Sequence, residues 1–188
     1  MEERKAAALD FATRNPERFA DVLGAHDEGG AAQAIVRARF HAAFAAATRA
    51  SYVLVAGEEL AHSAFHVAAG FGHTGHLDLV VADPPLGKSI TSAITRHSLD
   101  ERIRLHNANA ASVVPNLNGP FDLLIVNTNS VDAETLYEHC VRLLRVGGSM
   151  VIELESDFPA WLERLATDER LYVHVPDTES PAMAIRRR

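Results

Sequence analysis

From residue 51 onward, short apolar runs alternate with stretches that have the spacing of helices. Parallel neighbouring strands need a crossover between them, so this alternation is typical of a parallel sheet with helices on both faces. The pattern predicts strands over residues 52–56, 77–82, 102–106, 121–126 and 149–153. It predicts the intervening helices over residues 60–69, 86–97, 110–115 and 131–144.

The C-terminal part of the chain breaks this alternation. A predicted helix over residues 158–166 is followed by two apolar runs, 171–175 and 182–187, which the turn-forming residues 176–181 join. Two runs joined in this way form a hairpin, so we expect the last strand to be antiparallel to its neighbour. The expected fold is a three-layer α/β/α, Rossmann-like domain with a mostly parallel seven-stranded sheet.

The first fifty residues have helical patterns only. We expect helices over residues 2–14, 16–23 and 31–49, with Asn15-Pro16 and Gly29-Gly30 as the breaks. The chain thus divides into an N-terminal helical extension, residues 1–50, and a Rossmann-like part, residues 51–188, which together make one structural unit.

Composition narrows the class of protein. The chain has 188 residues, a single cysteine and a formal net charge of −7. One cysteine excludes a disulfide framework, and the acidic balance argues against nucleic acid as a partner. Since no apolar run is long enough for a membrane span and the first residues lack a signal-peptide pattern, we expect a cytoplasmic protein without a membrane partner.

Several motifs resemble those of class I S-adenosylmethionine-dependent methyltransferases, and most closely the cation-dependent O-methyltransferases of the catechol and caffeoyl-CoA type. Their positions follow the predicted strands from residue 52 to the C-terminus. They are Val53-Leu54-Val55-Ala56-Gly57, Val80-Val81-Ala82-Asp83-Pro84, Leu99-Asp100-Glu101-Arg102-Ile103, Asn109-Ala110, Gly119-Pro120-Phe121-Asp122-Leu123 and Leu143-Leu144-Arg145-Val146-Gly147-Gly148. The resemblance implies the methyltransferase fold and S-adenosylmethionine as cofactor. It also implies a homodimer formed through the N-terminal helices, above all residues 31–49.

The resemblance assigns the cofactor contacts residue by residue, and the sequence departs from the family at several of them. The assigned residues are Gly57, Glu58, Ser63, Asp83, Asn109 and Ala110. Only Gly57 remains of the glycines in the turn after the first strand. When the family's motifs are aligned with this sequence without gaps, Val81 occupies the position of the acid that binds the ribose. Because valine cannot accept a hydrogen bond through its side chain, we assign that role to Asp83, two residues later. The catalytic base stays unassigned, with His62 as the nearest candidate.

The family's metal site is also altered. The matching positions are Asn127, Glu153 and Leu154. Mg²⁺ prefers a shell of oxygen ligands, and these residues offer two side-chain oxygen donors with one formal charge. We therefore expect no bound divalent metal here, with Asn127 and Glu153 as weak candidates.

A second group of possible metal ligands lies on the helix after the first strand. His62 and His66 are four residues apart and hence on one helix face. Two imidazoles at this spacing can bind Zn²⁺ if a third ligand, such as Glu58 or Glu59, approaches them.

Three functions remain open. The first is an O-methyltransferase that acts on a small hydroxylated molecule with a divergent cofactor site. The second is a non-catalytic descendant that serves as the partner subunit of another protein or as a ligand sensor. The third is a metal-binding module that uses His62 and His66.

Overall fold

The computed structural model describes residues 17–22, 28–72, 74–127, 133–153, 158–175 and 181–187. The strands are β1 (Tyr52–Ala56), β2 (His76–Val80), β3 (Ile103–His106), β4 (Phe121–Asn127), β5 (Leu144–Glu153), β6 (Leu171–His174) and β7 (Ala182–Arg186). The α-helices are α2 (Glu28–Ala47), α3 (Ala61–Ala69), α4 (Pro84–Arg96), α5 (Ala110–Val113), α6 (Ala133–Leu143) and α7 (Phe158–Thr167). Short 3-10 turns are η1 (Ala20–Val22), η2 (Glu58–Leu60) and η3 (Val114–Asn116).

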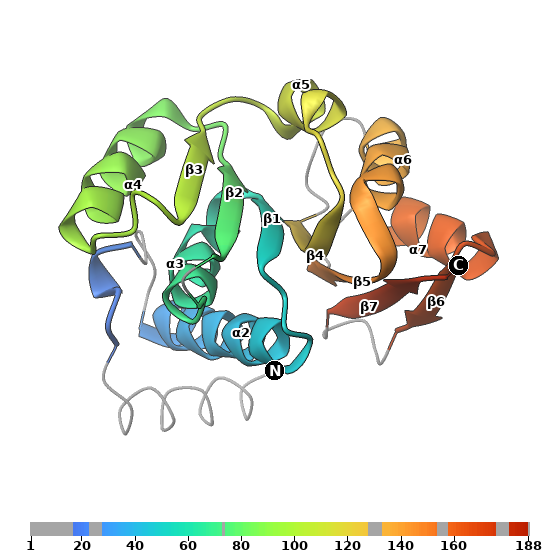
Figure 1. The fold of residues 1–188 in the computed structure, drawn as a ribbon, viewed down its shortest axis with the longest axis horizontal. Coiled ribbons are helices and arrows are strands. Elements are labelled where there is room, and N and C mark those ends of the chain that lie inside the picture. Colours follow the sequence, from blue (N-terminus) through green and yellow to red (C-terminus); the bar gives the residue numbers. More distant parts are fainter. Residues whose placement is uncertain are drawn as a thin grey trace.

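The seven strands form one sheet in the order β3-β2-β1-β4-β5-β7-β6. β1 to β5 run parallel, and β7 is antiparallel to both β5 and β6. The expected mostly parallel sheet with an antiparallel last strand is confirmed. The sheet order reverses between β1 and β4, because the chain leaves β1 toward β2 and leaves β4 toward β5 (Figure 1).

Helices cover the sheet on both faces, and each face has its own apolar core. On one face, α2, α3 and α4 pack against alternate residues of the central strands, such as Val53 and Val55 of β1. On the other face, α6 and α7 pack against the residues between them, such as Leu54. Because both faces are buried, the central strands are apolar throughout, which is why their sequence pattern was easy to recognise.

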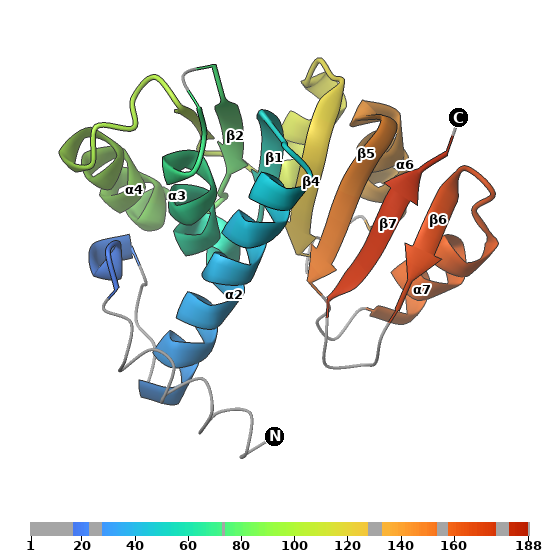
Figure 2. The same ribbon diagram turned by 60° about the horizontal axis from the view of Figure 1, so that its bottom comes forward.

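The helix α2 lies along the sheet beside α3 (Figure 2). Its residue Ala45 belongs to the same core as β1 and α3, so α2 and the Rossmann-like part share one apolar interior. The division at residue 50 stays a prediction. So does the homodimer, for which Val36 and Phe40 are the large apolar side chains that α2 leaves exposed.

The segment before α2 differs from the sequence prediction. The helix expected over residues 16–23 is, in its described part, only the 3-10 turn η1. Phe19 anchors this segment, with 1% of its surface exposed and its ring 5.7 Å from that of Phe65. A helical pattern in so short a segment was overridden by the packing of this one aromatic ring. The helix expected over residues 2–14 lies outside the described residues.

The strand β5 begins five residues earlier than expected, at Leu144 instead of Ser149. Its pairing with β4 shifts register between Phe121 and Leu123, which is a bulge. A side chain at Gly148 would come within 3.0 Å of the backbone oxygen of Asp122, so only glycine permits this close approach. The predicted strand began after Gly147 and Gly148, whereas the two glycines form an irregular part of the strand.

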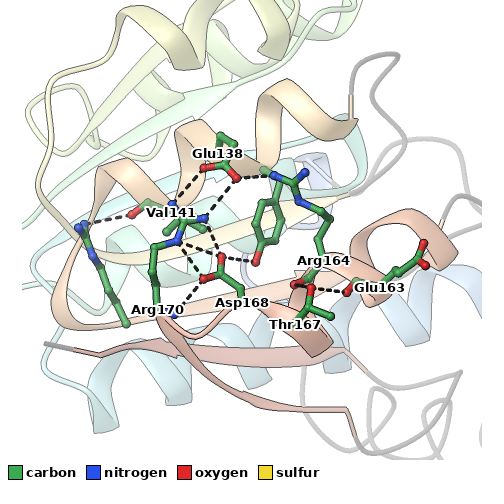
Figure 3. A network of polar contacts seen from close by, with 9 residues as sticks. Glu138, Val141, Glu163, Arg164, Thr167, Asp168 and Arg170 are labelled. Carbon is green, nitrogen blue, oxygen red and sulfur yellow. Dashed lines mark hydrogen bonds and ion pairs between the residues drawn. The ribbon is translucent and has the colours of Figure 1, made fainter.

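An ion network joins α6 to the chain that follows α7 (Figure 3). Arg170 donates to Asp168 Oδ2 at 2.7 Å and to Glu138 Oε2 at 3.0 Å, and Arg164 also donates to Glu138. The Tyr137 hydroxyl donates to Asp168 Oδ2 at 2.8 Å. The hydrogen bonds from Arg170, together with that from Tyr137, lower the pKa of Asp168 to about 2 although burial opposes them.

Among the described residues, no helix is long and apolar enough to cross a membrane.

Candidate functional site

The candidate site lies at the carboxyl ends of the parallel strands, where β1 and β4 are neighbours. Ligands in open α/β sheets bind at such a reversal of strand order, because the two following chains diverge and leave a crevice. Gly57 follows β1 and Asn127 ends β4. The Gly57 backbone has φ 137°, and a Cβ added there would lie 2.9 Å from Asn127 Cβ. Glycine is therefore required at this point both by conformation and by space.

The end of β2 supplies the next part of the site. Glu58 reaches across from the turn after β1, and its Oε1 accepts a hydrogen bond of 2.9 Å from the Ala82 amide. Val81 is 1% exposed and packs in the core, so the gap-free position cannot offer a polar contact to a ligand. Asp83 is exposed and stands directly before α4, which Pro84 begins.

The loop that carries Asp83 is held by β3. Asn107 follows β3, and its Nδ2 donates to the carbonyl oxygens of Val81 at 2.8 Å and of Asp83 at 3.1 Å. These two hydrogen bonds fix the backbone of Asp83 and leave its carboxylate at the surface. Asn107 was not singled out from the sequence. A side-chain amide just after a strand was the available signal, but it is common in loops.

Asn109 and Ala110 lie at the start of α5, beyond the end of β3. The Asn109 side chain caps this helix, because its Oδ1 accepts a hydrogen bond of 2.8 Å from the Ala111 amide. Asn109 is exposed and Ala110 is half-buried. A ligand that uses Asn109 has the Nδ2 hydrogens available, whereas the oxygen is already engaged in the cap.

Ser63 lies in the interior, in the first turn of α3. Its hydroxyl is 2.9 Å from Nδ1 of His41, and only 1% of Ser63 is exposed. On the other side of the same imidazole, Nε2 of His41 lies 2.8 Å from Oε1 of Glu153. His41 thus connects α2, α3 and the end of β5, and the structure places Ser63 in this contact rather than at an open surface.

The sequence contained a signal for His41 that we did not use. Ala34, Ala38, His41 and Ala45 follow one another at helical spacing, and all four are buried. A histidine in a buried apolar stripe needs polar partners, because an unpaired buried polar group is costly. The identity of those partners, Ser63 and Glu153, follows only from the tertiary structure.

The residues at the family's metal positions do not fit Mg²⁺. Asn127 and Glu153 are register partners on β4 and β5, so their backbones are adjacent. Glu153 is the one carboxylate of the pair, and His41 already contacts it. Leu154 lies outside the described residues. A hard dication needs more anionic oxygen than this pair offers.

His62 and His66 form a separate cluster, and our expectation about its third member was wrong. Glu58 is bonded to Ala82 and Glu59 contacts Arg37 at 3.7 Å, so neither approaches the two histidines. The third member is Glu17, whose Oε1 lies 3.0 Å from His62 Nε2 and 2.8 Å from His66 Nε2. His62 is 3% exposed and faces Glu17, which leaves it no access to a substrate as a base.

The comparisons with solved structures agree with this geometry. Cofactor-bound Rv0187 from MTB is 21% identical, with a TM-score of 0.70 over 98% of this chain and 88% of its own. The O-methyltransferase TomG from Streptomyces achromogenes, solved with SAM, is 16% identical, with a TM-score of 0.78 over 97% of this chain and 96% of its own. The chain has a Rossmann-like α/β methyltransferase fold.

A third neighbour with the same fold is an O-methyltransferase from Bacillus cereus in complex with SAH. It is 16% identical, with a TM-score of 0.78 over 97% of each chain. No family model matches this chain, and no curated protein matches its sequence. At these sequence identities, structural similarity establishes the methyltransferase fold only. Activity has to be inferred from the residues at the carboxyl edge of the sheet.

Proposed function

We propose that this protein is an S-adenosylmethionine-dependent O-methyltransferase that acts on a small hydroxylated molecule without a divalent metal ion. One observation carries the proposal. At the reversal of strand order, Gly57 has a backbone φ of 137°, which glycine adopts readily and other residues do not, and the exposed Asp83 carboxylate follows the neighbouring strand β2. Glycine after β1 and an acid after β2 are what a nucleoside ligand needs at this edge.

The chain's own residues divide the binding task. Gly57 admits the ligand to the turn after β1, Asp83 accepts hydrogen bonds from the ribose hydroxyls, and the Asn109 amide contacts the adenine. The exposed Glu58 carboxylate adds negative charge near the turn, which favours a sulfonium cation. The bound cofactor supplies an electrophilic methyl group. Because methyl transfer depends mainly on alignment, holding the two reactants in line accounts for much of the rate.

Glu153 is the candidate general base in this proposal. Its side chain is 13% exposed at the end of β5, and His41 lies 2.8 Å from its Oε1. This carboxylate would accept the proton of the acceptor hydroxyl, whose oxygen would take the methyl group that bound S-adenosylmethionine would supply. His41 is fully buried and acts as a positioning residue for Glu153.

A second candidate function is a non-catalytic protein of the same fold that acts as a partner subunit or a ligand sensor. The observation that favours it is the closure of the inner part of the site. Leu60 and His41 are completely buried, and the Ser63 hydroxyl is already engaged by His41. A cofactor that needed Ser63 would have to displace this contact.

The experiment that tests the proposal is the formation of S-adenosylhomocysteine from S-adenosylmethionine with a panel of catechols and phenols, measured by mass spectrometry. We expect turnover in the presence of EDTA. The variant Glu153→Gln should lose roughly 100-fold in rate, the usual scale of general-base catalysis, while Glu101→Gln, an exposed acid away from the site, should not. Turnover that requires Mg²⁺ would contradict the metal-independent proposal. Cofactor binding without turnover of any acceptor would favour the second candidate.

A further inference from the structure

Three potential metal ligands converge between the N-terminal segment and α3. Glu17 Oε1 lies 3.0 Å from His62 Nε2 and 2.8 Å from His66 Nε2. The two histidines stand one helical turn apart, with ring centroids 4.9 Å from each other. The ligand atoms of the three residues lie within 4.8 Å of one another. Two segments separated by about forty residues in sequence therefore bring one carboxylate and two imidazoles to a single point.

The cluster is enclosed by protein. The side chains of Glu17, His62 and His66 are 8%, 3% and 13% exposed. Oε2 of Glu17 is buried and accepts no hydrogen bond from the described residues, and Nη2 of Arg39 forms an ion pair with it at 3.8 Å. Enclosed carboxylates are usually paired with positive groups, and a metal ion would be one more such partner beside Arg39.

We propose that Glu17, His62 and His66 bind one Zn²⁺ ion. Two histidines and one glutamate are an established donor set for zinc, and imidazole nitrogen selects against Mg²⁺ and Ca²⁺. Tetrahedral bonds of ~2.0–2.1 Å place ligand atoms about 3.3 Å apart. Glu17 Oε1 would therefore move away from each nitrogen by only a few tenths of an ångström. Water supplies the fourth ligand on the side of His66, the most exposed of the three.

The ion would fasten residues 17–22 to the sheet domain. Phe19 in this segment already packs against Phe65 and His66 of α3. None of the three ligands is among the residues proposed to bind the cofactor or to act as base. The zinc site and the proposed methyltransferase activity therefore stand or fall separately.

The experiment is a titration of tag-free, chelator-treated protein with Zn²⁺ in a calorimeter, and with Co²⁺ followed by its visible absorption. We expect one ion per chain, a Kd on the order of 1 µM or tighter, and a rise in Tm when Zn²⁺ is added. The variants His66→Gln and Glu17→Gln should weaken binding at least ~10-fold. They should also abolish the Co²⁺ band of a tetrahedral nitrogen and oxygen site.

His97→Gln is the matched control. His97 Nε2 lies 3.0 Å from Asp21 Oδ1, so this histidine also joins residues 17–22 to a helix, here α4, through a carboxylate. The chain has ten histidines, and this variant removes one without touching the proposed ligands. Zinc binding should survive in it. The proposal is overturned if wild-type protein binds no Zn²⁺ at 100-fold the expected Kd, or if His66→Gln and Glu17→Gln bind as tightly as His97→Gln.

Discussion

At the scale of single residues, a few buried polar side chains decide how the N-terminal part relates to the site. His41 is completely buried in α2 and touches Ser63 of α3 and Glu153 of β5. Glu17 contacts His62 and His66 in a comparable way. Both groups of contacts fix α3, the helix that begins directly after the Gly57 turn. The N-terminal residues therefore help to build the candidate site rather than only flank it.

Gly57 gives the most direct residue-scale prediction. In Gly57→Ala the new methyl group meets Asn127 Cβ at 2.9 Å, in a backbone conformation with φ 137° that alanine rarely adopts. We expect a loss of about 1–3 kcal/mol in the free energy of unfolding, measured by urea denaturation.

The matched control is Gly72→Ala, where an added Cβ has no neighbour within 4 Å. That variant should stay within about 0.5 kcal/mol of wild type. Equal effects of the two substitutions would show that the turn after β1 does not have the constrained geometry described for it.

At the scale of elements, the strands were predictable and the irregular segments were not. The five parallel strands were recognised because buried parallel strands are short apolar runs, and the other two because the sequence indicated an antiparallel hairpin. The start of β5 was missed because Gly147 and Gly148 are as typical of turns as of bulges. The turn η1 was missed because its conformation depends on the packing of Phe19, a contact with residues far away in the sequence.

The network between α6 and the end of α7 gives an element-scale prediction. The pKa of Asp168 is lowered from 3.8 to about 2, mainly by its hydrogen bonds with Arg170. A lowered pKa means that the ionised form favours the folded state. Its contribution is complete above pH 3.8 and is lost as the pH falls toward 2.

Asp168→Asn should therefore be less stable than wild type at pH 7, by about 1 kcal/mol after allowance for solvent screening, and the difference should shrink by pH 3. Urea denaturation at the two pH values measures it. The control Glu163→Gln alters an exposed acid of α7 and should show no such change. A difference that stays constant or grows with acid would contradict the ion network.

At the scale of the whole molecule, the sequence predicted where the candidate site lies. It did not predict that buried side chains fill the inner part of this site. The positions of Gly57, Asp83 and Asn109 at the carboxyl edge follow from strand order alone, because each comes directly after or soon after a strand. The engagement of Ser63 by His41, and of His62 by Glu17, joins residues that are 22 and 45 positions apart. The hydrophobic pattern and the spacing of residues along the chain do not reveal such long-range contacts. The inner part of the site could therefore be described only from the three-dimensional structure.

The proposed function requires that the carboxyl edge of the sheet binds the methyltransferase cofactor. The most direct test is calorimetric titration of the protein with S-adenosylhomocysteine, with and without Mg²⁺. We predict a Kd in the micromolar range that is independent of Mg²⁺. It should be at least ~10-fold weaker in Asp83→Ala but unchanged in Glu101→Ala, since hydrogen bonds from the ribose to a carboxylate contribute about 1.5–3 kcal/mol. No binding at millimolar ligand, or equal binding by the two variants, would contradict the claim.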